Sequence, residues 1–170
     1  MLVVPLEYDS ESSAYVASVQ VGTPPQTFYV VFDTGSPQRW LLSAESNDPN
    51  IKSRKRKYKS KTRKLTETTV SVTYVSMKVV GRLVEDNLTI GGYTMDNFKF
   101  LEATEISEAI GKDEKFDGVF GLVLDMTSLT FHPTLLGLMQ QCDLIEEYSV
   151  SFRFCGYVLM NHIIHILPII

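Results

Sequence analysis

The sequence predicts a mostly β domain with little helix. Stretches of alternating apolar and polar residues, rich in β-branched and aromatic side chains, cover most of residues 15–32 and 68–104. Turn signals, GTPPQ and the Gly-Gly pair at 91–92, separate these stretches. Only residues 132–145 place apolar side chains at helical spacing. Since 44% of the residues are hydrophobic, the chain can build a buried core.

The first element is a β-hairpin over residues 15–32. AYVASVQV alternates in polarity, GTPPQ is turn chemistry, and TFYVVF is rich in β-branched and aromatic residues. The second strand runs directly into Asp33, which is followed by Thr34 and Gly35. A carboxylate among apolar side chains costs several kcal/mol unless hydrogen-bond donors surround it. Asp33 is therefore a candidate functional residue, with turn capping as the ordinary alternative.

A basic segment follows at residues 47–64. Nine of the 16 Lys and Arg residues of the chain fall between Lys52 and Lys64. The ordinary interpretation is an exposed, solvated loop between strands, because the only interleaved aromatic residue is Tyr58 and no recognition helix follows. The alternatives are a nuclear-localisation or polyanion-binding patch and a processing site for a protease specific for basic residues.

Strand patterning resumes at Thr68 and predicts three or four strands up to residue 104. The segment KFDGVFGL is a further apolar strand, and YSVSFRF returns to strand after the predicted helix. In that helix Leu135, Leu138, Met139 and Cys142 share one apolar face, which predicts a buried thiol at Cys142.

The two ends of the chain carry no clear targeting signal. The first residues lack a basic region followed by a long apolar stretch, so we expect either a cytosolic chain or a missing leader. Residues 155–170 form an atypical apolar tail that need not belong to the fold; a reading-frame shift or a retained intron is our hypothesis for it. The tail is too short and too interrupted for a membrane span.

Composition excludes several classes of function. A net charge of −4 and a pI near 5.4 argue against a nucleic-acid-binding protein. The two cysteines, Cys142 and Cys155, provide neither a disulfide framework nor metal-ligand spacing, and the three histidines have no ligand companions. We therefore expect no metal and no cofactor.

The run VGTPPQTFYVVFDTGSPQRW resembles the active-site hairpin of pepsin-like aspartic proteases, the family of pepsin and cathepsin D. The resemblance implies that Asp33 is one of two catalytic carboxylates. It also implies that Thr34 braces the active-site loops, that Gly35 lets the backbone approach the carboxylates, and that Ser36 hydrogen-bonds the outer carboxylate oxygen.

Three later segments follow the order of that family. SVTYVSMKVVGRLVEDNLTIGG resembles the flap, which implies that Tyr74 closes over substrate and that the Trp40 indole holds its hydroxyl. KFDGVFGL resembles the segment that threads through the active-site loop, which gives Asp117, Gly118 and Gly121 structural roles. LLGLMQQCDLIEEYSVSF resembles the exit from the first lobe. The resemblance thus implies an N-terminal lobe over residues 1–154, with the pepsin-like fold of β-hairpins, closed sheets and one or two short helices.

Two features depart from the family pattern. The flap tip, usually rich in glycine, reads Val75-Ser76-Met77 after Tyr74, and the chain contains no second Asp-Thr-Gly or Asp-Ser-Gly. The implied function is an aspartic-type endopeptidase, present as a truncated lobe with one catalytic Asp. A homodimeric protease and a non-catalytic peptide- or polyanion-binding module remain as alternatives.

The resemblance also implies partners and a location. The substrate would be a peptide or protein, and a missing C-terminal lobe or a second copy would complete the pair of carboxylates. Most members of the family are secreted or lysosomal, so either location is expected for this chain.

Overall fold

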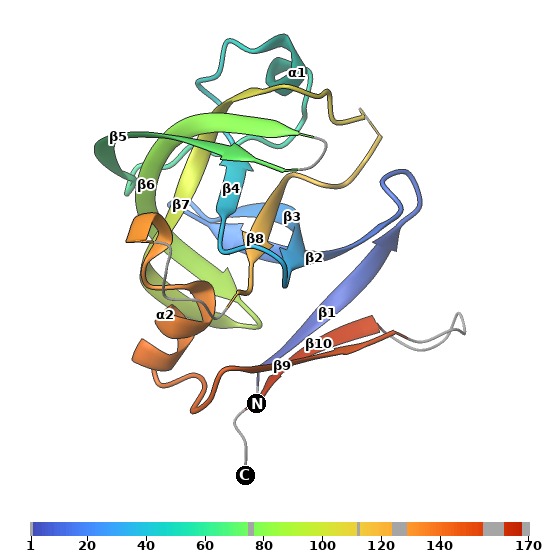
Figure 1. Ribbon diagram of the computed structural model, residues 1–170, viewed down its shortest axis with the longest axis vertical. Coiled ribbons are helices and arrows are strands. Elements are labelled where there is room, and N and C mark those ends of the chain that lie inside the picture. Colours follow the sequence, from blue (N-terminus) through green and yellow to red (C-terminus); the bar gives the residue numbers. More distant parts are fainter. Residues whose placement is uncertain (1, 75–76, 112, 124–128, 155–161, 168–170) are drawn as a thin grey trace.

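The computed structural model describes the chain except residues 1, 75–76, 112, 124–128, 155–161 and 168–170 (Figure 1). The described part is mostly strand, as the sequence predicts. The strands are β1 (Leu2–Asp9), β2 (Ala14–Val21), β3 (Gln26–Asp33), β4 (Arg39–Leu42), β5 (Lys64–Thr73), β6 (Lys78–Ile90), β7 (Tyr93–Ile106), β8 (Gly118–Gly121), β9 (Ser149–Arg153) and β10 (His162–Leu167).

The predicted hairpin is confirmed. Strands β2 and β3 pair antiparallel with Ala17 opposite Val30, and the turn between them spans residues 22–25. Phe28, Val30 and Phe32 are buried along β3, as expected from the two-residue period of a strand with one face in the core. This burial fixes the register of β3 and so the place where Asp33 ends the strand.

The strands form one sheet that closes on itself. Their order is β5-β6-β7-β4-β8-β3-β2-β1-β10-β9, and β2 also pairs with β6 at Gln20 and Val21. This extra pairing closes the strands from β6 to β2 into a barrel, while β1, β10 and β9 extend beyond it (Figure 1). The larger apolar cluster fills the barrel and continues under β1 and β10; its members include Val30, Phe98 and Phe120.

The basic segment is only partly a solvated loop. It contains the short helix α1 (Pro49–Lys52), capped by Asp48. Arg54 is 4% exposed and Tyr58 is fully buried, so the expectation of a fully exposed loop is wrong for these residues. The reason is long-range: both side chains find buried polar partners in strands or loops far along the sequence.

The helix α2 (Leu135–Gln141) confirms the predicted helix over a shorter range. Thr134 caps it by accepting a hydrogen bond from the Gly137 amide at 3.1 Å. Cys142 terminates the helix and its side chain is exposed, so the expectation of a buried thiol is wrong. The described helices are short, and none of them has the length and apolar character needed to cross a membrane.

Part of the C-terminal tail lies in the sheet. Residues 162–167 form β10, which pairs antiparallel with both β1 and β9. Ile164 and Ile166 are fully buried. The sheet therefore includes a portion of the segment that the sequence set apart as an atypical tail.

Candidate active site

Asp33 ends β3 and is held by its own loop. The Gly35 amide donates to Oδ1 of Asp33 at 2.8 Å, and the Ser36 hydroxyl donates to Oδ2 at 2.5 Å. Asp33 is half-buried, whereas Ser36 is 8% exposed. Each carboxylate oxygen thus has a fixed donor while part of the group still faces solvent, which is the arrangement expected of a reactive carboxylate rather than of a core residue.

Strand β8 supports the loop from the other side. It pairs parallel with β3, with Gly121 opposite Asp33, and the Leu122 amide donates to the Asp33 carbonyl oxygen at 2.7 Å. A Cβ atom on Gly121 would lie 2.1 Å from the Ser36 carbonyl oxygen, and one on Gly118 would lie 2.0 Å from the Trp40 carbonyl oxygen. Only glycine allows this close approach of backbones.

Tyr74 and Trp40 lie beside the same loop. The Trp40 indole Nε1 donates to the Tyr74 hydroxyl at 3.1 Å, and Trp40 is fully buried. Burial raises the pKa of Tyr74 to about 12, against the lowering effect of hydrogen bonds with Trp40 and Ser36. The charge of Asp33 also raises the pKa of Tyr74. The phenol is thus close to the candidate catalytic carboxylate and stays protonated across the acidic range.

The flap tip is described only in part. The Tyr74 amide donates to the Met77 carbonyl oxygen at 2.7 Å, which closes the turn between β5 and β6. Val75 and Ser76, which replace the expected glycine-containing tip, lie outside the described residues.

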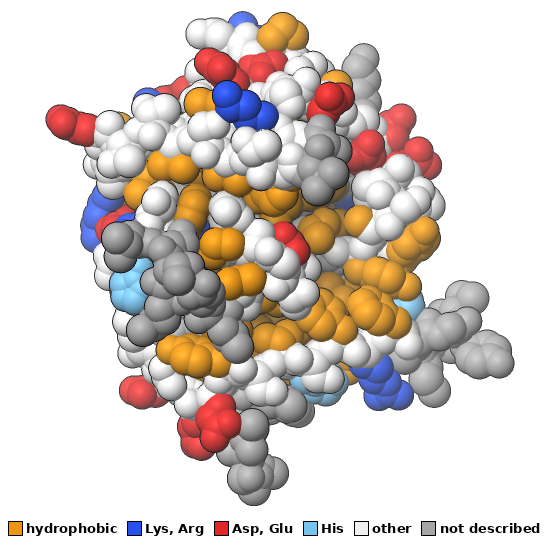
Figure 2. All heavy atoms as spheres, in the orientation of Figure 1, with side chains coloured by type: hydrophobic (Ala, Val, Ile, Leu, Met, Phe, Trp, Pro, Cys, Tyr) orange, Lys and Arg blue, Asp and Glu red, His pale blue; other side chains and the backbone are white. Residues whose placement is uncertain are grey.

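The face beyond Asp33 is open and apolar. Thr34 and Gly35 are exposed, and Thr34 lines a hollow of about 560 Å³ together with Leu122, Leu136 and Val150. Figure 2 shows hydrophobic side chains gathered in a broad band across this side of the molecule. Large exposed apolar patches mark interaction surfaces in soluble proteins. The loop that carries Asp33 therefore borders a hollow whose lining is largely apolar.

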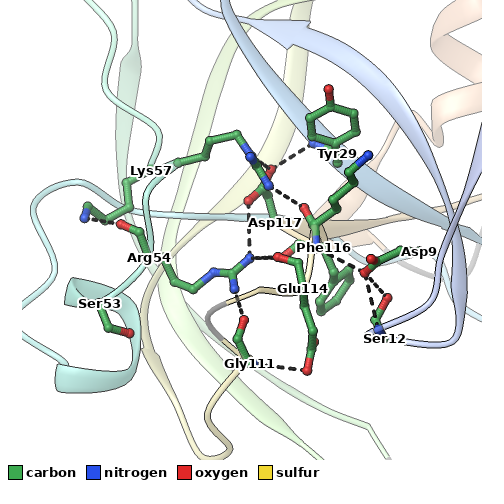
Figure 3. A network of polar contacts seen from close by, with 12 residues as sticks. Asp9, Ser12, Tyr29, Ser53, Arg54, Lys57, Gly111, Glu114, Phe116 and Asp117 are labelled. Atoms are coloured by element: carbon green, nitrogen blue, oxygen red, sulfur yellow. Dashed lines mark hydrogen bonds and ion pairs between the residues drawn. The ribbon is translucent and has the colours of Figure 1, made fainter.

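Asp117 lies one residue before β8 and is fully buried. Its Oδ2 accepts from the Tyr29 amide at 2.9 Å and from Arg56 Nε at 2.5 Å, and Arg54 Nη2 lies 3.6 Å from Oδ1 (Figure 3). Burial raises the pKa of Asp117, while the contacts with Arg56 and Tyr29 act in the opposite direction. This network ties the basic segment to the start of β8 and hence to the active-site loop.

Arg39 is a buried cation that sequence reasoning did not single out. Its Nη2 donates to the carbonyl oxygens of Phe131 and Pro133, and its guanidinium lies 5.2 Å from the ring centre of Phe98. Its Nε and Nη1 have no hydrogen-bond partner within the described part of the chain. Burial lowers the pKa of Arg39 to about 9. A charged residue directly before the apolar run Trp40-Leu41-Leu42 was the available signal.

The structure brings most of the sequence-predicted site residues together. Asp33, Gly35, Ser36, Trp40 and Tyr74 are linked by direct hydrogen bonds or by charge, and Gly118 and Gly121 brace the loop. Thr34 faces away from them toward the open hollow, and Asp117 lies in its own network. Among the described residues, no three His, Cys, Asp or Glu side chains converge as a metal site.

Comparison with known proteins agrees with this geometry. The family model for eukaryotic aspartyl proteases matches residues 14–154. An aspartic proteinase of Oryza sativa subsp. japonica is 34% identical over 152 residues, covering 88% of this chain and 30% of the relative. Procardosin-B of Cynara cardunculus is 31% identical over 148 residues, covering 85% of this chain and 29% of the relative.

A fungal relative gives the same result. Vacuolar protease A of Neurospora crassa is 31% identical over 144 residues, covering 83% of this chain and 36% of the relative. The chain therefore spans about a third or less of the length of these curated relatives, which corresponds to one lobe. On the strength of the matched family model, the similar relatives and the loop geometry around Asp33, the chain belongs to the eukaryotic aspartyl protease family.

Proposed function

We propose that this chain is one lobe of an aspartic-type endopeptidase in which Asp33 supplies one of two catalytic carboxylates. The observation that carries the proposal is the carboxylate of Asp33, held by the Gly35 amide and the Ser36 hydroxyl at the border of an open apolar face. Membership of the family supports the reaction class, which is hydrolysis of peptide bonds.

The chemistry needs a second carboxylate opposite Asp33. Two carboxyl groups in close contact share one proton, because two like charges at that distance are strongly disfavoured. The ionised member takes a proton from a bound water, which attacks the peptide carbonyl, while the protonated member donates to the carbonyl oxygen. Tyr74, held by Trp40 and close to Asp33, would cover the substrate from the flap side.

The partner that brings the second carboxylate would cover the apolar face. The sequence contains a single Asp-Thr-Gly triplet, so a C-terminal lobe or a second copy of this chain must provide the other. Strand β9 provides a place where a second copy could pair with the sheet. It lies at the edge of the sheet, and among the described residues its one strand neighbour is β10. An antiparallel pair of β9 strands satisfies two-fold symmetry.

The test is cleavage of a denatured protein at acidic pH by the purified 170-residue chain. Asp33→Asn removes the carboxylate, and Asp113→Asn makes the same chemical change at an exposed position as a matched control. We expect cleavage that is lost in Asp33→Asn, kept in Asp113→Asn and blocked by a general aspartic-protease inhibitor. Cleavage that survives Asp33→Asn contradicts the proposal.

The dependence of the cleavage rate on protein concentration shows whether a second copy of the chain supplies the second carboxylate. If a second copy completes the site, the rate rises with the square of protein concentration below the dimer dissociation constant. A folded chain that dimerises by light scattering and still does not cleave contradicts the second-copy arrangement and assigns the second carboxylate to a separate lobe.

The proposed location is an acidic compartment. Relatives carry the names vacuolar protease A and cathepsin D, and the shared proton of the carboxylate pair suits mildly acidic conditions. We propose a lysosomal, vacuolar or secreted location for this chain, testable by localising a tagged form in cells.

A further inference from the structure

The basic segment concentrates much of the positive charge of the chain. Residues 52–64 carry nine Lys and Arg and no Asp or Glu, whereas the rest of the chain carries seven Lys and Arg against all 20 Asp and Glu. The segment is therefore a concentrated positive region, with a formal charge of +9, on a chain that is otherwise at −13. The structure shows which of these charges remain available.

The three arginines of the segment all have hydrogen-bond or ion-pair partners within the lobe. Arg54 donates to the carbonyl oxygens of Gly111, Glu114 and Phe116, and Arg56 pairs with Asp117 (Figure 3). Arg63 makes a two-pronged contact with the buried carboxylate of Glu102, at 2.7 and 2.9 Å. The cations best suited to recognise phosphate or sulfate groups in pairs of hydrogen bonds are thus already occupied within the lobe.

Five lysines of the segment are exposed, and one of them, Lys64, donates a hydrogen bond to Asn97. Lys52, Lys55, Lys59 and Lys61 are exposed, and none of them forms an ion pair within the described part of the chain. We call these four residues the lysine surface. Lys55 is the least isolated of them, since it borders a small hollow that also contains Asp113 and Glu114.

The backbone beneath the lysine surface is fixed. The Lys61 amide donates to the Thr23 carbonyl oxygen at 2.9 Å, and the Lys59 amide donates to Gln26 Oε1 at 2.9 Å. Between them and Lys55, the buried Tyr58 hydroxyl donates to Asp86 at 2.5 Å. The segment cannot spread to relieve repulsion between its ammonium groups without breaking these contacts.

The spacing of the lysines concentrates their potential. Two residues of extended chain span at most about 7 Å, so the backbones at Lys59 and Lys61 lie within roughly one Debye length at physiological salt. Their fields add over such distances, and an anion that bridges them relieves their mutual repulsion. Exposed ammonium groups on a fixed backbone, without ion pairs to the described residues, therefore suit a polyanion.

We propose that the lysine surface binds an acidic polypeptide segment rich in Asp and Glu. Lysine ammonium groups act as point charges that suit carboxylates without demanding a fixed geometry, whereas the arginine forks that favour phosphate or sulfate are occupied. Tyr58, the aromatic residue on which a nucleic-acid base would stack, is fully buried. The surface lies on a different part of the lobe from β9 and β10 (Figure 1), so it leaves the apolar face free.

The proposal does not depend on proteolysis by Asp33. The test measures binding of a fluorescently labelled peptide of ten glutamates to the full chain at pH 7 by anisotropy. Lys59→Gln/Lys61→Gln removes two charges of the lysine surface. Lys78→Gln/Lys99→Gln removes two charges elsewhere and controls for the change in net charge, although Lys99 lies 3.7 Å from Glu85. We expect roughly fivefold weaker binding for the first variant and little change for the control, since exposed ion pairs each contribute modestly.

Salt and competing polymers complete the test. Binding should weaken strongly between low and high salt, and Asp33→Asn should bind like the wild type, because the contact is electrostatic and away from Asp33. Equal losses in the two double variants, or no binding at low salt by a folded chain, overturn the proposal. So does tighter binding of a sulfated oligosaccharide or a single-stranded oligonucleotide of matched charge, because either would identify a different class of partner.

Discussion

The active-site loop and the basic segment are both dense in polar groups, but their contacts differ in range. The carboxylate of Asp33 receives its two hydrogen bonds from residues two and three positions along the chain. Arg56 reaches Asp117 across 61 positions, and Arg63 reaches Glu102 across 39. The contacts of the Asp33 carboxylate lie within one short sequence motif. The contacts of Arg56 and Arg63 form only when the folded barrel brings distant segments together.

The carboxylates of the two regions also differ in their exposure to solvent. Asp33 is partly exposed, and its neighbour Thr34 lines an open hollow. Asp117 is fully buried and serves to hold the segment against the start of β8. The candidate catalytic carboxylate thus differs from the buried Asp117 in its solvent access and in the kind of donor that it meets.

The largest expected effect comes from breaking the long-range network. Asp117→Asn leaves Arg54 and Arg56 without their carboxylate in a buried setting, so we expect a loss of about 3 to 5 kcal/mol in the free energy of unfolding. Urea denaturation measures it. Asp113→Asn, an exposed change of the same kind, should alter stability by less than about 0.5 kcal/mol; equal losses would show that the network does not anchor the segment.

The next effect comes from crowding the active-site loop. Gly121→Ala places a Cβ atom 2.1 Å from the Ser36 carbonyl oxygen, so β8 and the loop must separate. We expect a loss of roughly 1 to 3 kcal/mol in stability. Gly35→Ala, whose Cβ would lie 3.2 Å from Asp33 Oδ1, should cost less. A smaller loss for Gly121→Ala than for Gly35→Ala would contradict the bracing role of β8.

A smaller effect sharpens the link between the loop and the flap. Tyr74→Phe removes the acceptor of the buried Trp40 N–H, which should cost about 1 kcal/mol. Trp40 is the sole tryptophan, so its fluorescence emission reports the change directly. An emission spectrum and stability identical to those of the wild type would show that the two side chains do not interact in solution.

The smallest effect is the pH dependence of the stability that Asp86 contributes; Asp86 accepts the hydrogen bond of the Tyr58 hydroxyl. Burial alone would raise the pKa of Asp86, but hydroxyl groups of the basic segment and the Asn87 amide donate to it and lower the pKa below 3.8. A carboxyl whose pKa is lowered on folding stabilises the fold above its unfolded pKa, and that stabilisation is lost as pH falls through the folded pKa.

The measurement compares the wild type with Asp86→Asn. The difference in their unfolding free energies should shrink by on the order of 1 kcal/mol as pH is lowered from 7 to below 3. Thermal unfolding in a series of buffers follows it. A difference that grows on acidification would mean that folding raises the pKa of Asp86 instead of lowering it.

Much of the fold and of the candidate site could be predicted from the sequence. The hairpin before Asp33 was predictable because strand alternation and turn chemistry are local, and the matched family supports the pepsin-like lobe. The helix was predictable from its apolar spacing, but its end was not, so Cys142 was placed wrongly in the core. Helix ends fray and the last turn is often irregular, so apolar spacing alone does not fix the last helical residue.

The sequence by itself determined where a strand ends in a carboxylate flanked by the donors it needs, because those donors lie within three residues of Asp33. The tertiary structure decided which charges are used internally and which face outward. Arg54 and Lys55 are neighbours with the same charge, yet one is buried and the other exposed. A guanidinium can be buried only where carbonyl or carboxylate oxygens converge on it, and such convergence is a property of the closed barrel rather than of any short stretch of chain.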